Sequence, residues 1–397
     1  MDKNIMEARR TRRQLLKATT ALAAVALLSA CGGGSQASTA GAAGPGGIAN
    51  EIKLMGVYDT TGPVAYAGVG ASKGMKLAMD EIQEQGFLGK DVKITLDEAD
   101  SAGSIERASS EVSRAIAKPE INAIFGPVSG QQAATVAPMV EKAGVPTIFN
   151  QAGSDGVVIG DYTFRGTAPM HSYYDIGAEY LADKGLTNVA VLYNGTYPTF
   201  AEIGQKVFPK LAEEHGLTIS SSYAVQSNTQ DFTAQAQEIA KNKPDAVVML
   251  LIAPQSVTAL TQLDQAGYKG QTIATSVQSA GNVAQAGEHA AGLVYPVDFS
   301  AAQEGELAVN FIEGFKKKYG EDPDPYAAEG YDSMWWMARG IKASGDSSRA
   351  GIQKGMQQVA SEGFEGVMGH LTFEGNDMRV NGVLVQWDGS KEHLVKK

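Results

Sequence analysis

The 397-residue chain holds a single cysteine, and this scarcity removes two kinds of structural support. One cysteine makes neither an internal disulfide nor the thiolate cage of a structural zinc site. Positive charge is also scarce, because 33 lysines and arginines face 44 aspartates and glutamates, for a net charge of −11. Such a chain repels a phosphate backbone, so nucleic acid is a poor candidate partner.

Sequence signs of a cofactor or of catalysis are few. The five histidines lie far apart, and none has a partner at the spacing of metal ligands on a helix. No Gly-Lys-Ser/Thr phosphate loop occurs, and segment 68–74 (GVGASKG) has Lys73 where the dinucleotide fingerprint needs glycine. We interpret that segment as a turn into a helix with close backbone packing. The sequence therefore predicts no enzyme, no metal and no cofactor, although a catalytic triad assembled from distant residues stays open.

The first thirty residues have the composition of an export signal. Six basic residues and two acidic ones precede an uncharged apolar run at 18–30. As a helix this run rises about 20 Å, which is short of the roughly 30 Å hydrocarbon core of a bilayer. Residues 11–17 (TRRQLLK) resemble the twin-arginine signal. We therefore predict that residues 1–30 are a signal peptide and not a membrane anchor.

The single cysteine stands where this signal ends. Residues 28–31 (LSAC) resemble a bacterial lipobox, which implies that Cys31 becomes the lipidated first residue of the mature chain. Residues 31–49 read as a flexible tether, because seven glycines occur between 32 and 47. Removal of residues 1–30 leaves 27 basic against 42 acidic residues, a net charge of −15. An acidic body on a lipid tether does not lie on an anionic membrane surface.

The rest of the chain alternates short apolar runs with longer amphipathic stretches. The length fits about two domains, and the alternation predicts two doubly wound α/β lobes with parallel sheets. The first series of expected strands is 52–58, 92–96, 121–125 and 147–150, with helices at 69–85, 104–117 and 131–142. The second series is 188–193, 218–224, 246–252 and 272–275, with helices at 200–215, 232–241 and 255–266.

The tail from residue 299 is expected to be mostly helical to 356, with extended segments at 371–374 and 382–387. These segments complete both sheets, so the chain crosses between the lobes more than once, near 168–172, 296–300 and 374–379. We expect lobe 1 to comprise 50–169 plus 298–376 and lobe 2 to comprise 170–297 plus 377–397.

Three polar turns follow strands of the first lobe, at 59–68, 126–131 and 150–154. In an open α/β sheet, ligands bind beyond the carboxyl ends of the strands, where helix N-termini present free N–H groups. Serine and glycine in any one turn usually just cap a helix. Three such turns on one sheet edge favour a binding site.

The chain resembles the type I periplasmic binding proteins, in particular the leucine/isoleucine/valine-binding branch. The resemblance covers residues 50–390, and its motifs keep the family's order and spacing. These motifs are 61–68 (TGPVAYAG), 126–130 (GPVSG), 144–148 (GVPTI) and 164–167 (FRGT). The resemblance implies two lobes joined by a multi-crossing hinge, which capture a small solute and deliver it to a membrane permease and its ATPase.

The resemblance also implies which residues bind the ligand. An aromatic side chain from the second lobe covers it, and Tyr197 or Phe200 stands at that place. Tyr66 lies beside the corresponding aromatic position of the first turn, which is Ala67. The ligand carboxylate is held by hydroxyl and N–H groups of the third and fourth turns, at Ser129, Gly130, Gln131, Ala152, Gly153 and Ser154.

The family's amino-acid receptors hold the ligand ammonium with acids from the second lobe, and here the sequence departs. The counterparts are Met170 and either Gln278 or Ser276, and no acidic residue lies between Gln265 and Gly287. An ammonium group needs a countercharge or several good acceptors. Asp298, near the second crossing, is one substitute. Residues 252–254 (IAP) add an apolar wall that suits an alkyl or aromatic acid as well as leucine.

Together these features predict a monomeric lipoprotein receptor outside the cytoplasm, in the periplasm or its equivalent. It would serve an ABC importer and bind a small carboxylate-bearing solute, most simply a branched-chain or other hydrophobic amino acid. Three alternatives stay open. They are a receptor for aromatic or alkyl acids or amides without an ammonium group, a sensor coupled to a membrane kinase, and a surface enzyme acting on a small acid or amide.

Overall fold

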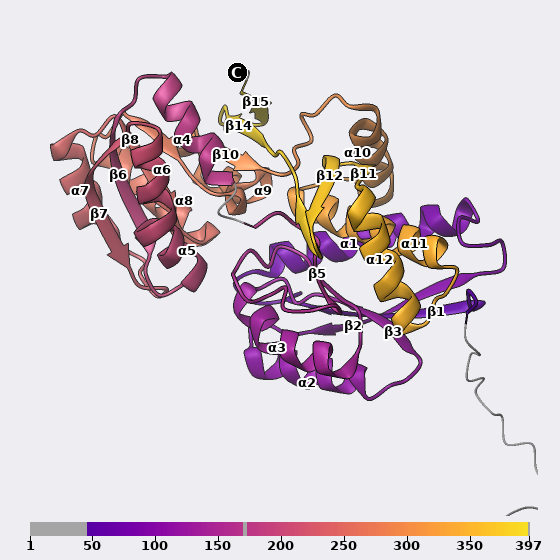
Figure 1. Cartoon of the computed structure of the whole chain (residues 1–397). Helices are drawn as coiled ribbons and strands as arrows, with labels where there is room; N and C mark the ends of the chain where they lie inside the picture. The colour runs from indigo at the N-terminus through magenta and orange to yellow at the C-terminus, as the bar shows by residue number, and fades with distance from the viewer. Residues whose placement is uncertain (1–45, 170–172, 396–397) are drawn as a thin grey trace, which may run out of the picture. The chain divides into compact units, whose positions relative to one another are not determined.

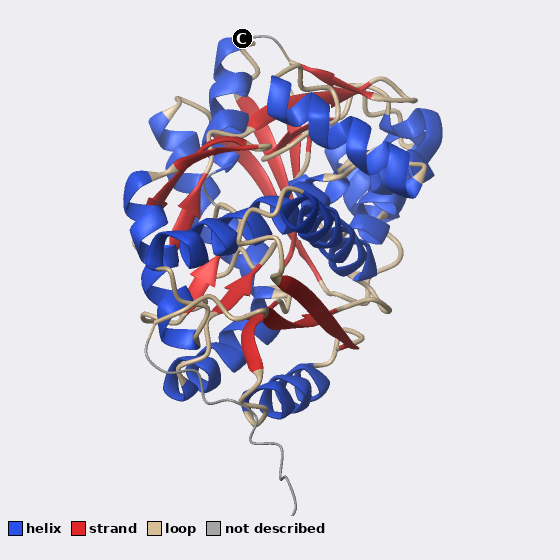
Figure 2. Ribbon diagram, turned by 90° about the vertical axis from the view of Figure 1, so that its right-hand side faces the viewer, coloured by secondary structure: helices blue, strands red, loops and turns tan. Residues whose placement is uncertain are grey.

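The computed structural model describes residues 46–169 and 173–395 (Figure 1). The predicted signal peptide, Cys31, the tether up to residue 45, and Met170 lie outside the described residues. Within the described part of the chain, two separate sheets are present, as predicted. Figure 2 shows their strands flanked by helices.

Within the described residues, the first sheet has eight strands in the order β11-β12-β13-β5-β4-β3-β1-β2. The pairs from β2 to β5 are all parallel, which confirms the predicted doubly wound arrangement. The strands are β1 (Glu51–Tyr58), β2 (Lys93–Asp100), β3 (Ile121–Phe125), β4 (Thr147–Phe149), β5 (Thr163–Arg165), β11 (Phe364–Gly366), β12 (Gly369–Glu374) and β13 (Asp377–Arg379).

Helices cover both faces of this sheet, and strand β1 shows why. Its residues alternate in direction, so Leu54 joins a core with α1, α11 and α12, whereas Met55 and Val57 join a core with α2 and α3. The helices are α1 (Ala65–Glu84), α2 (Ile105–Ile116), α3 (Gly130–Ala143), α10 (Glu306–Tyr319), α11 (Pro325–Ser344) and α12 (Arg349–Glu362).

The second sheet has, within the described residues, seven strands in the order β15-β14-β10-β9-β8-β6-β7. They are β6 (Asn188–Asn194), β7 (Thr218–Val225), β8 (Ala246–Leu250), β9 (Gln271–Ile273), β10 (Val294–Val297), β14 (Val383–Trp387) and β15 (Glu392–Leu394). The α-helices are α4 (Tyr173–Asp183), α5 (Pro198–Glu202), α6 (Phe208–Glu214), α7 (Thr233–Asn242), α8 (Ala253–Gln265) and α9 (Ala280–Val283). The helix predicted at 200–215 is divided, because a π-helical turn, Ile203–Val207, joins α5 to α6.

The tail completes both sheets, as predicted, but the last crossing is displaced. Strand β13 (Asp377–Arg379) pairs with β12 and β5 in the first sheet, so the chain returns to the second sheet only between Arg379 and Val383. The expected lobe boundary at 376/377 is therefore a few residues early. The strands β5, β10, β11, β13 and β15 and the helix α4 were not expected from the sequence. No helix in the described part of the chain is long and apolar enough to cross a membrane.

Candidate functional site: the cleft at the strand ends

The three polar turns of the first lobe meet at one sheet edge. Strands β4, β3 and β1 are neighbours, and their parallel pairing brings their carboxyl ends together. The β3–α3 and β4 turns touch directly, because a Cβ on Gly130 would lie 2.1 Å from the Ser154 hydroxyl. Only glycine therefore fits at residue 130.

These turns face residues of the second lobe across a cavity of about 40 Å³. That volume holds about one or two water molecules, so a solute of leucine's size requires the two walls to separate. Six of the ten predicted ligand-binding residues line this cavity: Tyr66, Ser129, Gly130, Gly153, Tyr197 and Phe200.

Ser129 is the N-cap residue of α3, but its hydroxyl makes no capping hydrogen bond. It interacts instead with the hydroxyl of Tyr197 from the second lobe. Burial raises the pKa of Tyr197, the contact with Ser129 opposes that rise, and the charge of Asp59 adds to it. The serine is thus turned toward the cleft, at the positive end of a 14-residue helix.

Ser154 makes the second polar contact between the walls. Its hydroxyl lies 2.6 Å from the hydroxyl of Thr199, near the start of α5. The backbone of the Ser154 turn is held from behind, because Arg165 donates to the carbonyl oxygens of Ala152 and Ser154 at 3.2 and 3.0 Å. Ala152 itself is buried in the core beneath the turn.

Aromatic rings form part of both walls. Tyr66 packs against Tyr326 of α11, with ring centroids 5.4 Å apart, and burial raises the Tyr66 pKa. Tyr197 packs against Phe200 at 5.2 Å, and Phe200 is fully buried. Both second-lobe aromatics named from the sequence therefore lie at the cavity.

The other four predicted residues do not line the cavity: Gln131, Ala152, Ser154 and Gln278. Gln278 is buried, and its amide group donates to the carbonyl of Leu251 and to the Ser256 hydroxyl, so it braces the end of β8. Its neighbour Val277 lines the cavity instead. Gln131 does not line the cavity, and its carbonyl accepts a hydrogen bond from Thr135 one turn later in α3.

Asp298 lies in the hinge and not at the cavity. Thr167, in the first crossing, donates to Asp298 at 3.3 Å and to Glu329 of α11 at 3.0 Å. Burial and the adjacent Asp298 raise the pKa of Glu329 well above its usual range. Glu329 also accepts a hydrogen bond from the backbone of Gln151, a cavity residue. Burial and the neighbouring Asp298 therefore favour the protonated form of Glu329 beneath the site.

Asp59 and Gln151 lie in turns that the sequence predicted to form the site, but neither residue was assigned a role there, and Thr199 was not expected. Asp59 follows β1 directly and is fully buried. Gln151 has a positive φ of 52°, which is unusual for a residue other than glycine. The sequence offered one indication of such a residue, namely that the acidic Asp59 follows a strand of buried apolar residues.

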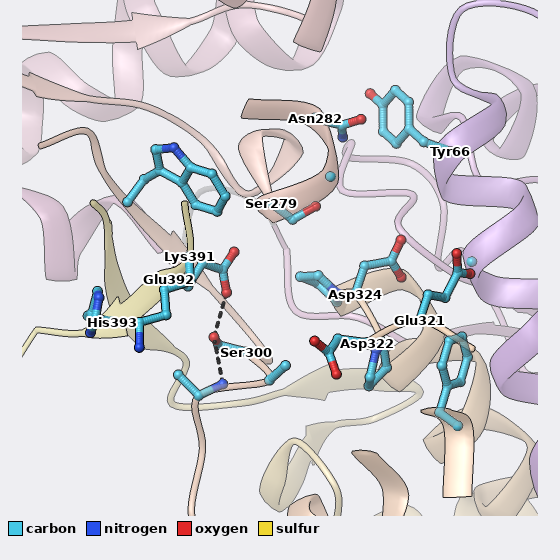
Figure 3. Close-up of a pocket in the computed structure, with 18 of the residues that line it drawn as sticks. Tyr66, Ser279, Asn282, Ser300, Glu321, Asp322, Asp324, Lys391, Glu392 and His393 are labelled. Atoms are coloured by element: carbon cyan, nitrogen blue, oxygen red, sulfur yellow. Dashed lines mark hydrogen bonds between the residues drawn. The ribbon is translucent and has the colours of Figure 1, made fainter. Parts of the chain in front are cut away.

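A second, larger cavity of about 1190 Å³ adjoins Tyr66. In Figure 3, Glu321, Asp322 and Asp324 stand on one side of it, and Glu392 on the other is joined to Ser300. Its walls come from α1, the α10–α11 connection and the β14–β15 hairpin. Among the described residues, no group of three or more acidic, histidine or cysteine side chains is placed to hold a metal ion.

The glycine-rich segment 68–74 lies inside α1, where its glycines pack against other backbone. A Cβ on Gly68 would lie 2.1 Å from the Asp59 carbonyl oxygen, and one on Gly74 would lie 1.8 Å from that of Ala327. The interpretation as close packing is confirmed, although the segment lies within the helix. Residues 70–74 also match the Gly-x-Ser-x-Gly spacing of a nucleophile elbow, but Ser72 is in mid-helix and bonded to Glu98.

Comparison with known proteins agrees with this architecture. The periplasmic binding protein family model matches residues 51–391. A Leu/Ile/Val-binding protein homolog 7 from Brucella abortus is 26% identical over 379 residues, covering 88% of this chain and 92% of that one. Two solved structures resemble the fold. One is LivJ of Streptococcus pneumoniae, a branched-chain amino acid transporter substrate-binding protein in complex with isoleucine. It has a TM-score of 0.79 and 24% identity, and the match covers 87% of this chain and 100% of that one. The solute-binding protein of an ABC transporter from R. palustris, in complex with benzoate, has a TM-score of 0.77 and 19% identity, and the match covers 87% of this chain and 95% of that one.

Proposed function

Because the chain belongs to the periplasmic binding protein family, we propose that it is the solute-binding receptor of an ATP-driven importer. Its ligand is a small carboxylate-bearing solute, a branched-chain or other hydrophobic amino acid. The observation that carries this proposal is the cleft at the strand ends. There the Ser129 hydroxyl, which makes no capping hydrogen bond, and the N-terminus of α3 lie beside Ser154.

The polar groups of the first lobe suit a carboxylate. Hydroxyl donors at Ser129 and Ser154 and the backbone N–H groups that begin α3 give charge-assisted hydrogen bonds to an anion. The second lobe offers apolar surface in Phe200, Ile252 and Val277, which suits an alkyl side chain. The two walls thus match the two ends of a hydrophobic amino acid.

Binding requires no bond chemistry in this proposal. We assign lobe 1 to 50–169 plus 298–379 and lobe 2 to 173–297 plus 383–395, with the hinge at the three crossings. The ligand favours closure because only the closed state satisfies groups from both walls. Micromolar affinity corresponds to about −8 kcal/mol, which several charge-assisted hydrogen bonds and one buried alkyl group supply.

The matching test removes both hydroxyls from the first wall. Ser129→Ala combined with Ser154→Ala is expected to weaken leucine binding at least about tenfold, because hydrogen bonds to a charged group contribute about 1.5–3 kcal/mol each. Isothermal titration calorimetry of the mature chain measures the affinity. The control is Ser110→Ala on the exposed face of α2. Unchanged affinity in the double variant would show that these turns are not the site.

A second candidate ligand class is an aromatic or alkyl acid without an ammonium group. It is favoured because no acidic residue lines the small cavity within the described residues. Titrations with benzoate and 4-methylpentanoate under the same conditions distinguish this ligand class from amino acids. If either acid binds more tightly than leucine, the ligand is an acid without an ammonium group. The same cleft would serve a receptor that signals to a membrane kinase.

The setting of the receptor is part of the proposal. Cleavage before Cys31 and lipidation of its thiol would place the acidic body outside the cytoplasm, tethered at the membrane that holds the permease. We propose that it acts there as a monomer, with no cofactor, and that the permease recognises the closed lobes.

A further inference from the structure

The carboxyl group of Asp59 is fully buried behind the first-lobe wall of the cavity and does not line it. Asp59 is the first residue after β1 and has no solvent exposure. One carboxylate oxygen, Oδ1, accepts three hydrogen bonds. The donors are the Ser101 hydroxyl at 2.7 Å, the Gly103 N–H at 2.6 Å and the Gln132 amide at 3.0 Å. The side chain is therefore fixed in one orientation.

The other carboxylate oxygen has no such support. Asp59 Oδ2 and the amide oxygen of Gln132 are both buried, and neither has a hydrogen-bond partner. No lysine, arginine or histidine in the described ranges forms an ion pair with Asp59. Both atoms are acceptors, so neither satisfies the other. A buried carboxylate without a countercharge is costly, and an unsatisfied group of this kind calls for a partner.

These two acceptors lie next to the carboxylate-binding turns. Gln132 is two residues beyond Gly130, which lines the cavity, and it stands in the first turn of α3. On the other side, α1 packs on the Asp59 backbone through Gly68, one residue after the cavity residue Ala67. Across the cleft, the charge of Asp59 acts on Tyr197, the residue that meets Ser129.

We propose that Asp59 Oδ2, supported by Gln132, holds the protonated amino group of the ligand. This inference rests on the proposed function, since it places an ammonium beside the carboxylate held at Ser129. The ligand class is then an α-amino acid, in preference to the corresponding carboxylic acid. Movement of Tyr197 and Thr199 with the second lobe opens the space that the amino group enters.

The arrangement accounts for the missing acid in the second lobe. No acidic residue occurs between Gln265 and Gly287 because the countercharge comes from the first lobe. Both charged ends of the amino acid then bind to one wall, and the second lobe contributes apolar contacts and closure.

Asp59→Asn tests the proposal with little structural disturbance. The asparagine oxygen replaces Oδ1 and keeps its three hydrogen bonds, while the negative charge of the side chain is removed. We expect an unchanged or higher melting temperature, a ten- to hundredfold loss of leucine affinity, and unchanged 4-methylpentanoate affinity. Asp155→Asn, an exposed acid on the β4 turn, is the control for net charge and is expected to keep the wild-type preference.

The outcomes separate this inference from the proposed function. If the wild-type protein binds 4-methylpentanoate as tightly as leucine, the carboxylate site stands and the role of Asp59 is wrong. A large drop in the melting temperature of Asp59→Asn without ligand makes Asp59 structural and also overturns the proposal. If neither carboxylate binds, the proposed function fails. In that case 3-methylbutylammonium tests Asp59 separately. If this amine raises the melting temperature of the wild type but not of Asp59→Asn, the role of Asp59 is supported. Equal shifts in the two proteins contradict it.

Discussion

At the scale of single residues, the site depends on Arg165, a side chain that lies behind it. Arg165 is buried and makes a two-pronged ion pair with Asp377 of β13, at 2.7 and 2.8 Å. Its remaining terminal nitrogen holds the carbonyl oxygens of Ala152 and Ser154. One side chain therefore connects the proposed ligand-binding turn after β4 to the strand that precedes the last crossing between the lobes.

Replacement of Arg165 by methionine is expected to cost about 1–3 kcal/mol of unfolding free energy, because the partly buried Asp377 loses two hydrogen bonds and keeps only its ion pair with Arg379. Leucine affinity is also expected to fall, since the turn carbonyls lose their donor. Addition of Asp377→Leu restores part of the stability but not the affinity. Urea denaturation and calorimetric titration measure the two quantities. If affinity recovers together with stability, Arg165 supports the fold alone.

At the scale of elements, the first lobe is organised by two helices in backbone contact. A Cβ on Gly74 of α1 would lie 1.8 Å from the Ala327 carbonyl oxygen, and one on Gly330 of α11 would lie 2.1 Å from that of Ala71. This crossing fixes α1, and α1 carries Tyr66 at the cavity. The glycines are therefore needed for close approach and not for a turn or a phosphate.

Gly74→Ala tests this crossing. Overpacking against a backbone carbonyl costs about 1–3 kcal/mol or more, which exceeds the gain of about 1 kcal/mol from better helix propensity. The melting temperature is expected to fall by several degrees in thermal denaturation. Gly314→Ala in α10 is the matched control, because its Cβ would meet nothing closer than 3.7 Å. A neutral Gly74→Ala would show that the two helices shift apart without cost.

Local patterns in the sequence predicted the long elements better than the contacts between them. Strand β3 was predicted at its observed bounds, since four buried apolar residues and Asn122 stand between turn signals. Five strands were missed: β5, β11, β13 and β15 have only three residues each, and β10 contains Pro296. The three-residue strands β4 and β9 were predicted because turn signals flank them. The partners of Asp59 lie between 42 and 73 positions away, so no local pattern indicated them.

At the scale of the whole molecule, acidic groups are buried where the chain crosses between the lobes. Asp298 directly follows strand β10, at the second crossing, and Thr167 lies at the first crossing. Both side chains contact Glu329 of α11. Asp332, one turn further along α11, accepts from the Val367 and Met368 N–H groups, and burial raises its pKa to about 7. Burial therefore raises the pKa of both Glu329 and Asp332 above the values of the unfolded chain.

Stability is expected to fall as pH rises through this region. In the unfolded chain Glu329 loses its proton near pH 4.5, whereas in the folded protein it keeps the proton to a higher pH. Between these two pKa values the folded state binds more protons than the unfolded state. The free energy of unfolding therefore decreases as the pH increases. Glu329→Gln mimics the protonated acid and keeps an acceptor for Thr167 and a donor for Asp298. Urea denaturation from pH 5 to 8 is expected to show a shallower decline for this variant than for the wild type, with the Asp332 contribution common to both. Parallel pH profiles would mean that Glu329 is ionised in the folded hinge.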